Sequence, residues 1–337
     1  MTHATINWIS ESVLRASTHR PFRVNETALV GPQKLLGEVI RIHGDEVVIQ
    51  VYEDTTGLRP GDPVSGTGTE LSVQLGPGLL GNIFDGLLRP LANQGVHVKP
   101  GAGGQQSGKT YPFKPSVRVG TRLTSGNVFG TVHRPDALAQ HCLVPPDCQG
   151  EVVEISPAGE YTEDQPICKL RRSTGETCVI AMAHYWPVRQ PRPIAEHLPT
   201  EGPLFTGQRI LDSIFPLACG GRAAMPGGFG TGKTVLQETL AKWCDADVIV
   251  YVGCGERGNE MAGVLHEFPA LEDTRRGRPL MERTVIIANT SNMPVAAREA
   301  SIYTAVTVAE FFRDQGMRVA LMADSTSRWA EALREIS

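Results

Sequence analysis

The spacing of hydrophobic residues changes at about residue 200 of the chain. Before that point, short β-branched runs alternate with turn residues. Residues 36–42 and 46–52 are two such runs, separated by His43-Gly44-Asp45, which predicts a β-hairpin. Further short runs lie at 63–64 and 70–75. Short strands with frequent turns predict a small β-barrel or sandwich over residues 1–69, followed by a connecting segment over 70–95.

The next stretch, residues 96–190, has no helical period and is rich in Gly, Pro and Val. Strand-like runs at 113–120, 126–132 and 151–155 are separated by turn residues, so we expect a second, inserted β-rich module. The proline-rich segment Trp186-Pro-Val-Arg-Gln-Pro-Arg-Pro193 is interpreted as an extended linker.

From 191 to 337 the pattern is one of alternating strands and helices. Continuous apolar runs at 247–253, 283–289 and 317–324 are typical of buried parallel strands, and residues 234–244 repeat at a helical period. A second helix is predicted over 296–315, with one apolar face formed by Ile302, Ala305, Val306, Ala309 and Phe312. Alternation of this kind predicts an α/β domain with a parallel sheet.

Composition excludes several classes of protein. The 337 residues suggest about two domains, and 41% hydrophobic with 20% charged residues is not the composition of a disordered chain. A net charge of −4 argues against a nucleic-acid binder. The N-terminus has no signal peptide and no apolar run reaches membrane-spanning length, so we expect a soluble, cytosolic chain. Seven irregularly spaced cysteines without a CxxC pair predict free thiols rather than a disulfide or zinc framework.

The phosphate-loop pattern GxxxxGK[ST] occurs twice, at 103–110 and 227–234. A phosphate loop needs a strand before it and a helix after it, because the helix N-terminus directs free N–H groups at the phosphates. Tyr-Pro-Phe-Lys-Pro follows Thr110, and its prolines forbid a helix, so 101–110 is interpreted as a mobile surface loop.

The second match has the expected surroundings. An apolar approach, 221–226, precedes it, and an amphipathic helix follows. Lys233 is expected to contact the β- and γ-phosphates and Thr234 to hold Mg²⁺. The predicted nucleotide-binding residues are Gly227, Gly228, Phe229, Gly230, Thr231, Gly232, Lys233, Thr234 and Val235.

Two carboxylates follow other predicted strands. Asp324 ends the run 319–324, which is the Walker B arrangement, in which the acid binds Mg²⁺ through a water. Glu256 and Glu260 follow the strand at 247–253. They either face the ligand crevice, where Glu256 would polarise the attacking water, or are solvated residues at the start of a helix. Spacing alone leaves both interpretations open.

Together these motifs resemble one family. Gly228–Thr234, Gly253–Met261, Asn289–Pro294 and Ala323–Ala332 are similar to the catalytic A-type chain of the V-type and A-type rotary ATPases. Residues 76–91 resemble that family's entry into its nucleotide domain, and 113–120 fall in its non-homologous insertion, which F-type β chains lack. The resemblance begins at about residue 20 and covers the rest of the chain.

The resemblance implies ATP hydrolysis or synthesis coupled to proton or sodium transport, with ATP/ADP and Mg²⁺ as cofactors. It implies that Glu256 polarises the lytic water, that Arg257 lies beside the γ-phosphate and that Asp324 is the Walker B acid. It further implies an alternating A₃B₃ hexamer in which a B-type subunit supplies the arginine finger. Stalk subunits and a membrane rotor would complete the complex on the cytoplasmic face of a membrane. A weaker implication places Arg328 at the interface between neighbouring chains.

The chain departs from the family pattern at three places. Gly228 and Thr231 stand where family members often have Pro or, in eukaryotes, Cys, so no disulfide switch is expected at 231. The family also continues for more than 200 residues beyond the Walker B region, through the adenine pocket and a helical domain. We therefore expect a truncated chain, ending in a helix that begins near Ser327, with little ATPase activity alone.

Two alternatives stay open: a flagellar or type III secretion export ATPase, which the long insertion disfavours, and an inactive nucleotide-binding fragment.

Overall fold

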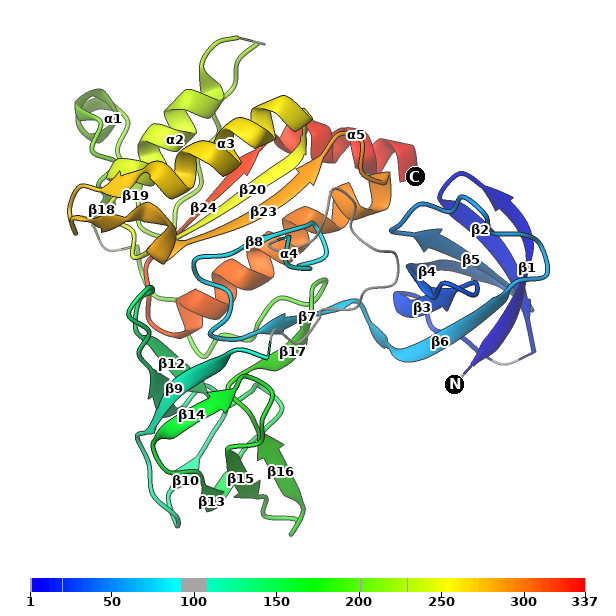
Figure 1. Cartoon of the computed structure of the whole chain (residues 1–337), viewed down its shortest axis with the longest axis horizontal. Helices are drawn as coiled ribbons and strands as arrows, with labels where there is room; N and C mark the ends of the chain where they lie inside the picture. The colour runs from blue at the N-terminus through cyan, green and yellow to red at the C-terminus, as the bar shows by residue number, and fades with distance from the viewer. Residues whose placement is uncertain (1, 20, 92–107, 201, 229, 337) are drawn as a thin grey trace.

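A computed structural model describes residues 2–19, 21–91, 108–200, 202–228 and 230–336. The N-terminal barrel lies to one side of a parallel sheet covered by helices, and a second β-rich module lies below that sheet (Figure 1). The expected class, two β modules joined to an α/β domain, is confirmed.

The N-terminal barrel closes upon itself in the order β1-β2-β5-β4-β3-β6. Its strands are β1 (His3–Ser10), β2 (Val13–Thr18), β3 (Glu26–Val30), β4 (Leu35–His43), β5 (Glu46–Val51) and β6 (Pro63–Glu70). The predicted hairpin is β4–β5, in which His43 pairs with Glu46 across a two-residue turn. Gly44 takes a φ of 56° there, which glycine adopts without strain. Leu14, Val39, Ile49 and Val64 are fully buried in the barrel core.

The second β module consists of two four-stranded sheets, in the orders β10-β13-β15-β16 and β12-β11-β9-β14. Its strands are β9 (Thr110–Pro115), β10 (Arg122–Leu123), β11 (Val128–Val132), β12 (Gln140–Leu143), β13 (Gly150–Ile155), β14 (Gly159–Thr162), β15 (Cys168–Arg171) and β16 (Thr177–Ile180). Phe113, Phe129, Val152 and Leu170 pack between the sheets. The runs predicted at 126–132 and 151–155 are β11 and β13, whereas the run at 113–120 overlaps β9 only up to Pro115. The short strand β10 and the strands β12 and β14–β16 lacked a pattern strong enough to predict them.

The proline-rich segment is not wholly a linker. Its first residues belong to β17 (His184–Pro187), which pairs antiparallel with β7 (Ser72–Leu75). Trp186 donates from Nε1 to the carbonyl of Gln190 at 2.7 Å, which folds the following turn back on this strand. The prolines are compatible with a strand because Pro187 lies at its end, where no ladder hydrogen bond is lost.

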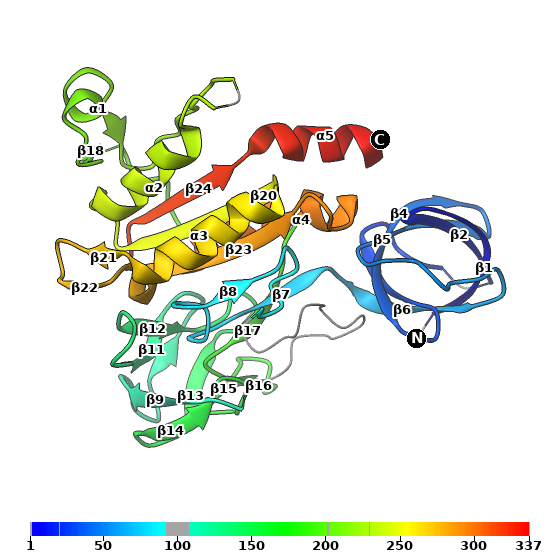
Figure 2. The ribbon, with the colours of Figure 1, turned by 45° about the horizontal axis from the view of Figure 1, so that its top comes forward.

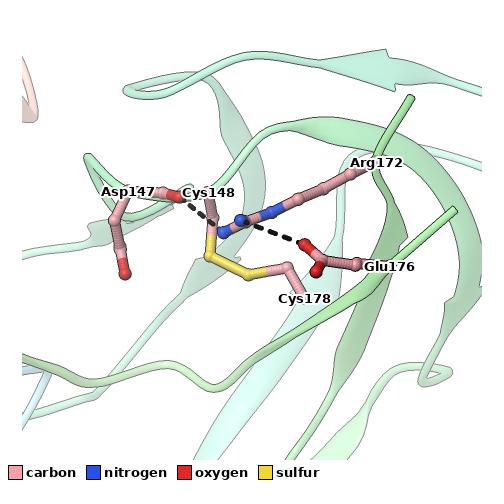
Figure 3. Close-up of a disulfide and its surroundings, with 5 residues drawn as sticks. All are labelled: Asp147, Cys148, Arg172, Glu176 and Cys178. Carbon is pink, nitrogen blue, oxygen red and sulfur yellow. Dashed lines mark hydrogen bonds and ion pairs between the residues drawn. A yellow bond between two sulfur atoms is a disulfide. The ribbon is translucent and has the colours of Figure 1, made fainter. Parts of the chain in front are cut away.

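The expectation that every cysteine is a free thiol is wrong for one pair. Cys148 and Cys178 form a disulfide between a loop and β16, with their Cα atoms 6.3 Å apart (Figure 3). Arg172 lies beside it, donating to the Asp147 carbonyl at 2.8 Å and pairing with Glu176. Sequence spacing could not show this pair because 30 positions separate the two residues. The buried free thiols are those of Cys142, Cys168, Cys244 and Cys254.

The C-terminal domain is built on a parallel sheet in the order β24-β20-β23-β8. Helices α2 and α3 cover one face of this sheet and α4 covers the other (Figure 2). The sheet strands are β8 (Ile83–Phe84), β20 (Val248–Glu256), β23 (Thr284–Thr290) and β24 (Val319–Asp324). The helices are α2 (Lys233–Trp243), α3 (Gly258–Ala270), α4 (Val295–Asp314) and α5 (Thr326–Ile336).

Smaller elements surround this sheet. They are β18 (Pro203–Leu204), α1 (Arg209–Ile214), β19 (Leu217–Ala218), β21 (Glu272–Asp273), β22 (Arg278–Pro279) and the 3₁₀ helix η1 (Leu280–Arg283).

The α/β domain differs from the prediction in two details. Val306 of α4 is 39% exposed, although Ala305 and Phe312 are buried as expected. The buried stripe instead runs through Ala297, Ala300, Thr304 and Val308, because the sheet lies against a neighbouring face of the helix. Residues 221–228, which approach the phosphate loop, do not form a strand, although Met225 packs against the core beneath α2.

Across the described ranges, no helix combines the length and apolar content that crossing a bilayer requires.

Candidate nucleotide site

The phosphate loop meets α2 at Gly232, whose φ of 81° is the left-handed conformation that favours glycine. No side chain caps the helix, so its first N–H groups remain available to an anion. The Lys233 ammonium donates to the carbonyl of Gly227 at 2.7 Å and to that of Gly228 at 3.4 Å. The loop carbonyls therefore hold this cation at the N-terminus of α2.

The other predicted loop residues are placed in different ways. Thr231 donates to the carbonyl of Gly228 at 2.9 Å, and a side chain at Gly227 would collide with the Thr231 hydroxyl. Val235 follows Thr234 on the helix and is 65% exposed. Phe229 lies outside the described residues.

Thr234 and Asp324 meet across 90 positions of sequence. The Thr234 hydroxyl donates to Asp324 Oδ2 at 2.6 Å, joining the first turn of α2 to the end of β24. Asp324 is only 4% exposed. A hydroxyl and a carboxylate are hard oxygen donors that suit Mg²⁺, and the hydroxyl keeps lone pairs for a metal while donating its proton. These two oxygen donors fit the predicted metal.

Glu256 ends β20 rather than starting a helix. The pairing of β20 with β23 shifts register between Cys254 and Glu256, and Gly255 takes a φ of 70° at that point. Such a bulge redirects the following side chain. Ser291 N–H donates to the Glu256 carbonyl at 2.8 Å, which ties the bulge to the turn after β23. Glu260 lies within α3, so the two acids belong to different elements.

The two predicted arginines lie on different helices. Arg257 is the exposed N-cap residue of α3, one position after Glu256. Arg328 lies near the start of α5 and pairs with Glu331 at 3.2 Å. A side chain at Gly255 would collide with the Arg298 side chain at 2.8 Å and would come within 3.0 Å of the Cβ of Arg328, so the start of α5 lies close to the bulge.

Tyr251 and Glu238 were missed by sequence reasoning. Tyr251 lies on the sheet face that carries Asp324, and Glu238 lies on α2, which covers that face. Burial, followed by the charges of Asp324, Glu238 and Glu256, raises the pKa of Tyr251 well above its ordinary value. Burial, with the charges of Glu267 and Asp324, also raises the pKa of Glu238. The available signal was a tyrosine in an otherwise aliphatic strand and a glutamate one helical turn after Thr234.

The first match to the phosphate-loop pattern behaves as its prolines predicted. Thr110 starts β9, so a strand rather than a helix follows Lys109. Most of that loop lies outside the described residues. Of the two matches, the second is therefore the one that combines the pattern with a helix N-terminus.

A glycine-rich loop before a helix, with a carboxylate from an adjoining strand at the same edge of a parallel sheet, defines a nucleotide-binding domain of the phosphate-loop class. Three family models match successive parts of the chain. They are the ATP synthase alpha/beta family beta-barrel domain (residues 23–68), the ATP synthase alpha/beta barrel-sandwich domain (105–189) and the ATP synthase alpha/beta family nucleotide-binding domain (207–337). The chain belongs to the ATP synthase alpha/beta family.

Two curated relatives are similar to almost the whole of this chain. The A subunit of the A-type ATP synthase of Thermococcus sibiricus is 55% identical over 96% of this chain and 56% of its own length. The V-type ATP synthase alpha chain of Halothermothrix orenii is 52% identical over 98% of this chain and 57% of its own length. The chain thus spans a little over half the length of the curated relatives it matches.

A solved structure, the assembled ATPase EscN of the type III secretion system of enteropathogenic E. coli, has a TM-score of 0.61. It is 24% identical and the match covers 99% of this chain and 59% of that one. At this identity the likeness supports the fold alone.

Proposed function

We propose that this chain carries the nucleotide-hydrolysing or nucleotide-synthesising site of an A-type or V-type ATP synthase, with ATP/ADP and Mg²⁺ as ligands. The observation that carries the proposal is the joining of α2 to β24 through Thr234 and Asp324, at the sheet edge where β20 ends in Glu256. Relatives 52–56% identical to the chain have these names.

Each side chain has a proposed task. The Lys233 ammonium exchanges loop carbonyls for β- and γ-phosphate oxygens, and the free N–H groups of α2 bind the same phosphates. Thr234 and Asp324 hold Mg²⁺, which when bound neutralises charge on the transferred phosphoryl group. Glu256 accepts a hydrogen bond from the attacking water, and Arg257 stabilises charge at the γ-phosphate.

The assembly is also part of the proposal. We infer a hexamer in which this chain alternates with a B-type subunit that supplies an arginine finger. Stalk subunits would connect it to a membrane rotor that moves protons or sodium ions, which places the chain on the cytoplasmic face of a membrane. We also propose domain divisions at 69/70, 95/96 and 190/191. The first and last are supported by the end of β6 at Glu70 and of β17 at Pro187, and the division at 95/96 lies outside the described residues.

Nucleotide binding by the chain itself is the first test. A fluorescent ATP analogue should bind the 337-residue chain, and Lys233→Ala should weaken binding about 10- to 100-fold, through loss of a charge-assisted hydrogen bond. Lys109→Ala is the matched control, because it removes the lysine of the first pattern match. Equal losses in both variants, or no binding by the unaltered chain, would reject the site.

Turnover is tested in the assembled complex. Glu256→Gln should abolish ATP hydrolysis while ATP still binds, because the amide cannot take up the proton of the attacking water. Unchanged turnover would remove Glu256 from its proposed role. A complex that binds nucleotide but never hydrolyses it, even unaltered, would support the inactive-fragment alternative.

A further inference from the structure

The bulge in β20 decides which face of the sheet Glu256 occupies. Cys254 pairs with Asn289, and Glu256 pairs with Thr290, the next residue of β23, so Gly255 is an extra residue in the strand. Side chains alternate along a strand, so without this extra residue Cys254 and Glu256 would share the face that α4 covers. The bulge instead places Glu256 on the opposite face of the sheet.

That opposite face carries Asp324. Gly253 pairs with Asp324 in β24, and paired residues of neighbouring strands share a face of the sheet. Asp324 in turn accepts a hydrogen bond from Thr234 at the start of α2. The bulge therefore brings Glu256 to the same face as the two proposed metal ligands.

Arg298, near the start of α4, lies against the bulge. A Cβ added to Gly255 would come within 2.8 Å of Arg298 Cδ and 2.9 Å of its Nε, so the arginine side chain covers this glycine. Arg298 Nη2 donates to the Ser291 carbonyl at 3.0 Å, and the Ser291 N–H donates to the Glu256 carbonyl at 2.8 Å. The Cys254 thiol donates to the Arg298 carbonyl at 3.5 Å. Helix α4 is thus linked to the residues on both sides of Gly255.

Packing alone does not account for an arginine at this position. Arg298 is 8% exposed, and within the part of the chain that the structure describes its Nε has no hydrogen-bond partner. Burying a charged group with an unsatisfied donor costs free energy, which an aliphatic side chain of similar length would avoid. The hydrogen bond to the Ser291 carbonyl is the interaction that such a side chain could not make.

We propose that Arg298 is a positioning residue that holds the β20 bulge in the geometry that directs the Glu256 carboxylate to the attacking water. The inference rests on the proposed function, because it concerns the same site. Arg298 acts through Ser291 and the backbone of Glu256, not by contact with the nucleotide. Since a misplacement of about 1 Å can slow a reaction about 100-fold, loss of this link should lower kcat rather than nucleotide affinity.

The test is steady-state ATP hydrolysis by the assembled complex, with the rate expressed per nucleotide site counted by titration with a fluorescent ATP analogue. Arg298→Met keeps an aliphatic side chain over Gly255 and removes the donors. We expect kcat to fall about 10- to 100-fold, while KM and the affinity for the analogue stay within about twofold. A merely structural role would lower the number of sites or their affinity and leave kcat per site unchanged.

Thr304→Val is the matched control. The Thr304 hydroxyl donates from α4 to the Gly86 carbonyl at 3.0 Å, the same distance as the bond from Arg298 to Ser291. Valine keeps the shape of this side chain and removes its donor, so kcat should stay within about twofold of the unaltered value.

Arg298→Lys is the second variant, and it decides the matter if Arg298→Met does not assemble. It keeps the positive charge but replaces the planar guanidinium with an ammonium on a shorter arm. We expect kcat per site to fall about three- to tenfold, again with little change in KM.

The outcomes separate the inference from the proposed function. Turnover that survives Glu256→Gln, or no nucleotide binding by the unaltered complex, rejects the proposed function and the inference together. If Glu256→Gln abolishes turnover, three results reject the inference alone. They are an unchanged kcat per site in the deciding Arg298 variant, a loss in that variant that lies in KM, and an equal loss of kcat in Thr304→Val.

Discussion

The N-terminal barrel and the nucleotide-binding sheet use β-structure in opposite ways. In the barrel every strand has two neighbours, so backbone pairing is completed within residues 3–70. The parallel sheet of β24, β20, β23 and β8 instead gathers its site from segments far apart in sequence, at 227–234, 253–257 and 324. A closed sheet suits a rigid, self-sufficient module, whereas the carboxyl edge of an open parallel sheet leaves loops free for chemistry.

The two regions are joined by a buried ion cluster. Arg189, just after β17, donates to Glu38 of the barrel at 2.7 and 2.8 Å and to Glu299 of α4 at 3.0 and 2.9 Å. Burial lowers the pKa of Arg189, but its hydrogen bonds to Glu38 and Glu299 outweigh burial and raise it. The contrast between barrel and sheet can therefore be tested at the residue that connects them.

Arg189→Met should have the largest effect on stability. It leaves Glu38 and Glu299, which are 2% and 5% exposed, as neighbouring unpaired acids, and losses of about 3–5 kcal/mol are typical of such changes. Urea denaturation followed by tryptophan fluorescence measures the loss. The triple variant that adds Glu38→Gln and Glu299→Gln should recover much of it, and a loss below about 1 kcal/mol would show that the cluster does not join the two regions.

Leu14→Ala should weaken the barrel alone. Leu14 is fully buried in its core, and a cavity of this kind costs about 3 kcal/mol. Fluorescence of Trp8, on β1, should report an earlier barrel transition, while nucleotide affinity at the sheet stays the same. A parallel loss of nucleotide affinity would mean that the barrel is not self-sufficient.

His184 should make the region packed against α4 sensitive to acid. Burial, aided by the charge of Arg192, lowers the pKa of His184 from 6.5 to about 3. The folded state therefore binds fewer protons than the unfolded state between these values, so this contribution to stability is complete above pH 6.5 and declines as the pH falls towards 3. The expected loss is about 2 kcal/mol between about pH 8 and pH 5.

The matched variant for this prediction is His184→Gln, which has no titrating group. Between about pH 8 and pH 5, its free energy of unfolding should fall by about 2 kcal/mol less than that of the unaltered protein. Identical pH profiles in urea denaturation would show that His184 titrates alike in the folded and unfolded protein.

Lys169→Met should have the smallest effect. Lys169 lies 2.6 Å from Glu154, a distance similar to those around Arg189, but the two side chains are 43% and 65% exposed. Exposed pairs contribute about 0–1 kcal/mol. A loss as large as that of Arg189→Met would show that burial does not distinguish the two ion pairs.

The sequence predicted best where one segment carries its own signal. Hydrophobic periodicity located β20, β23, β24 and α4 to within a few residues, and the prolines after Thr110 distinguished the two phosphate-loop patterns without reference to any distant contact. Periodicity failed at Val306 and at β10, β12 and β14–β16, because burial there depends on which neighbour covers a residue. Local pattern contains no information on that neighbour.

The amino-acid order alone thus determined the hairpin β4–β5, the parallel α/β arrangement and the choice between the two phosphate-loop patterns. Each depends on turn chemistry, side-chain period or helix termination, which act over a few residues. The tertiary structure decided which distant side chains meet: Thr234 with Asp324, Arg189 with Glu38, and Cys148 with Cys178. The partners in these pairs are 30 to 151 positions apart, and strand register and the packing of distant elements bring them together.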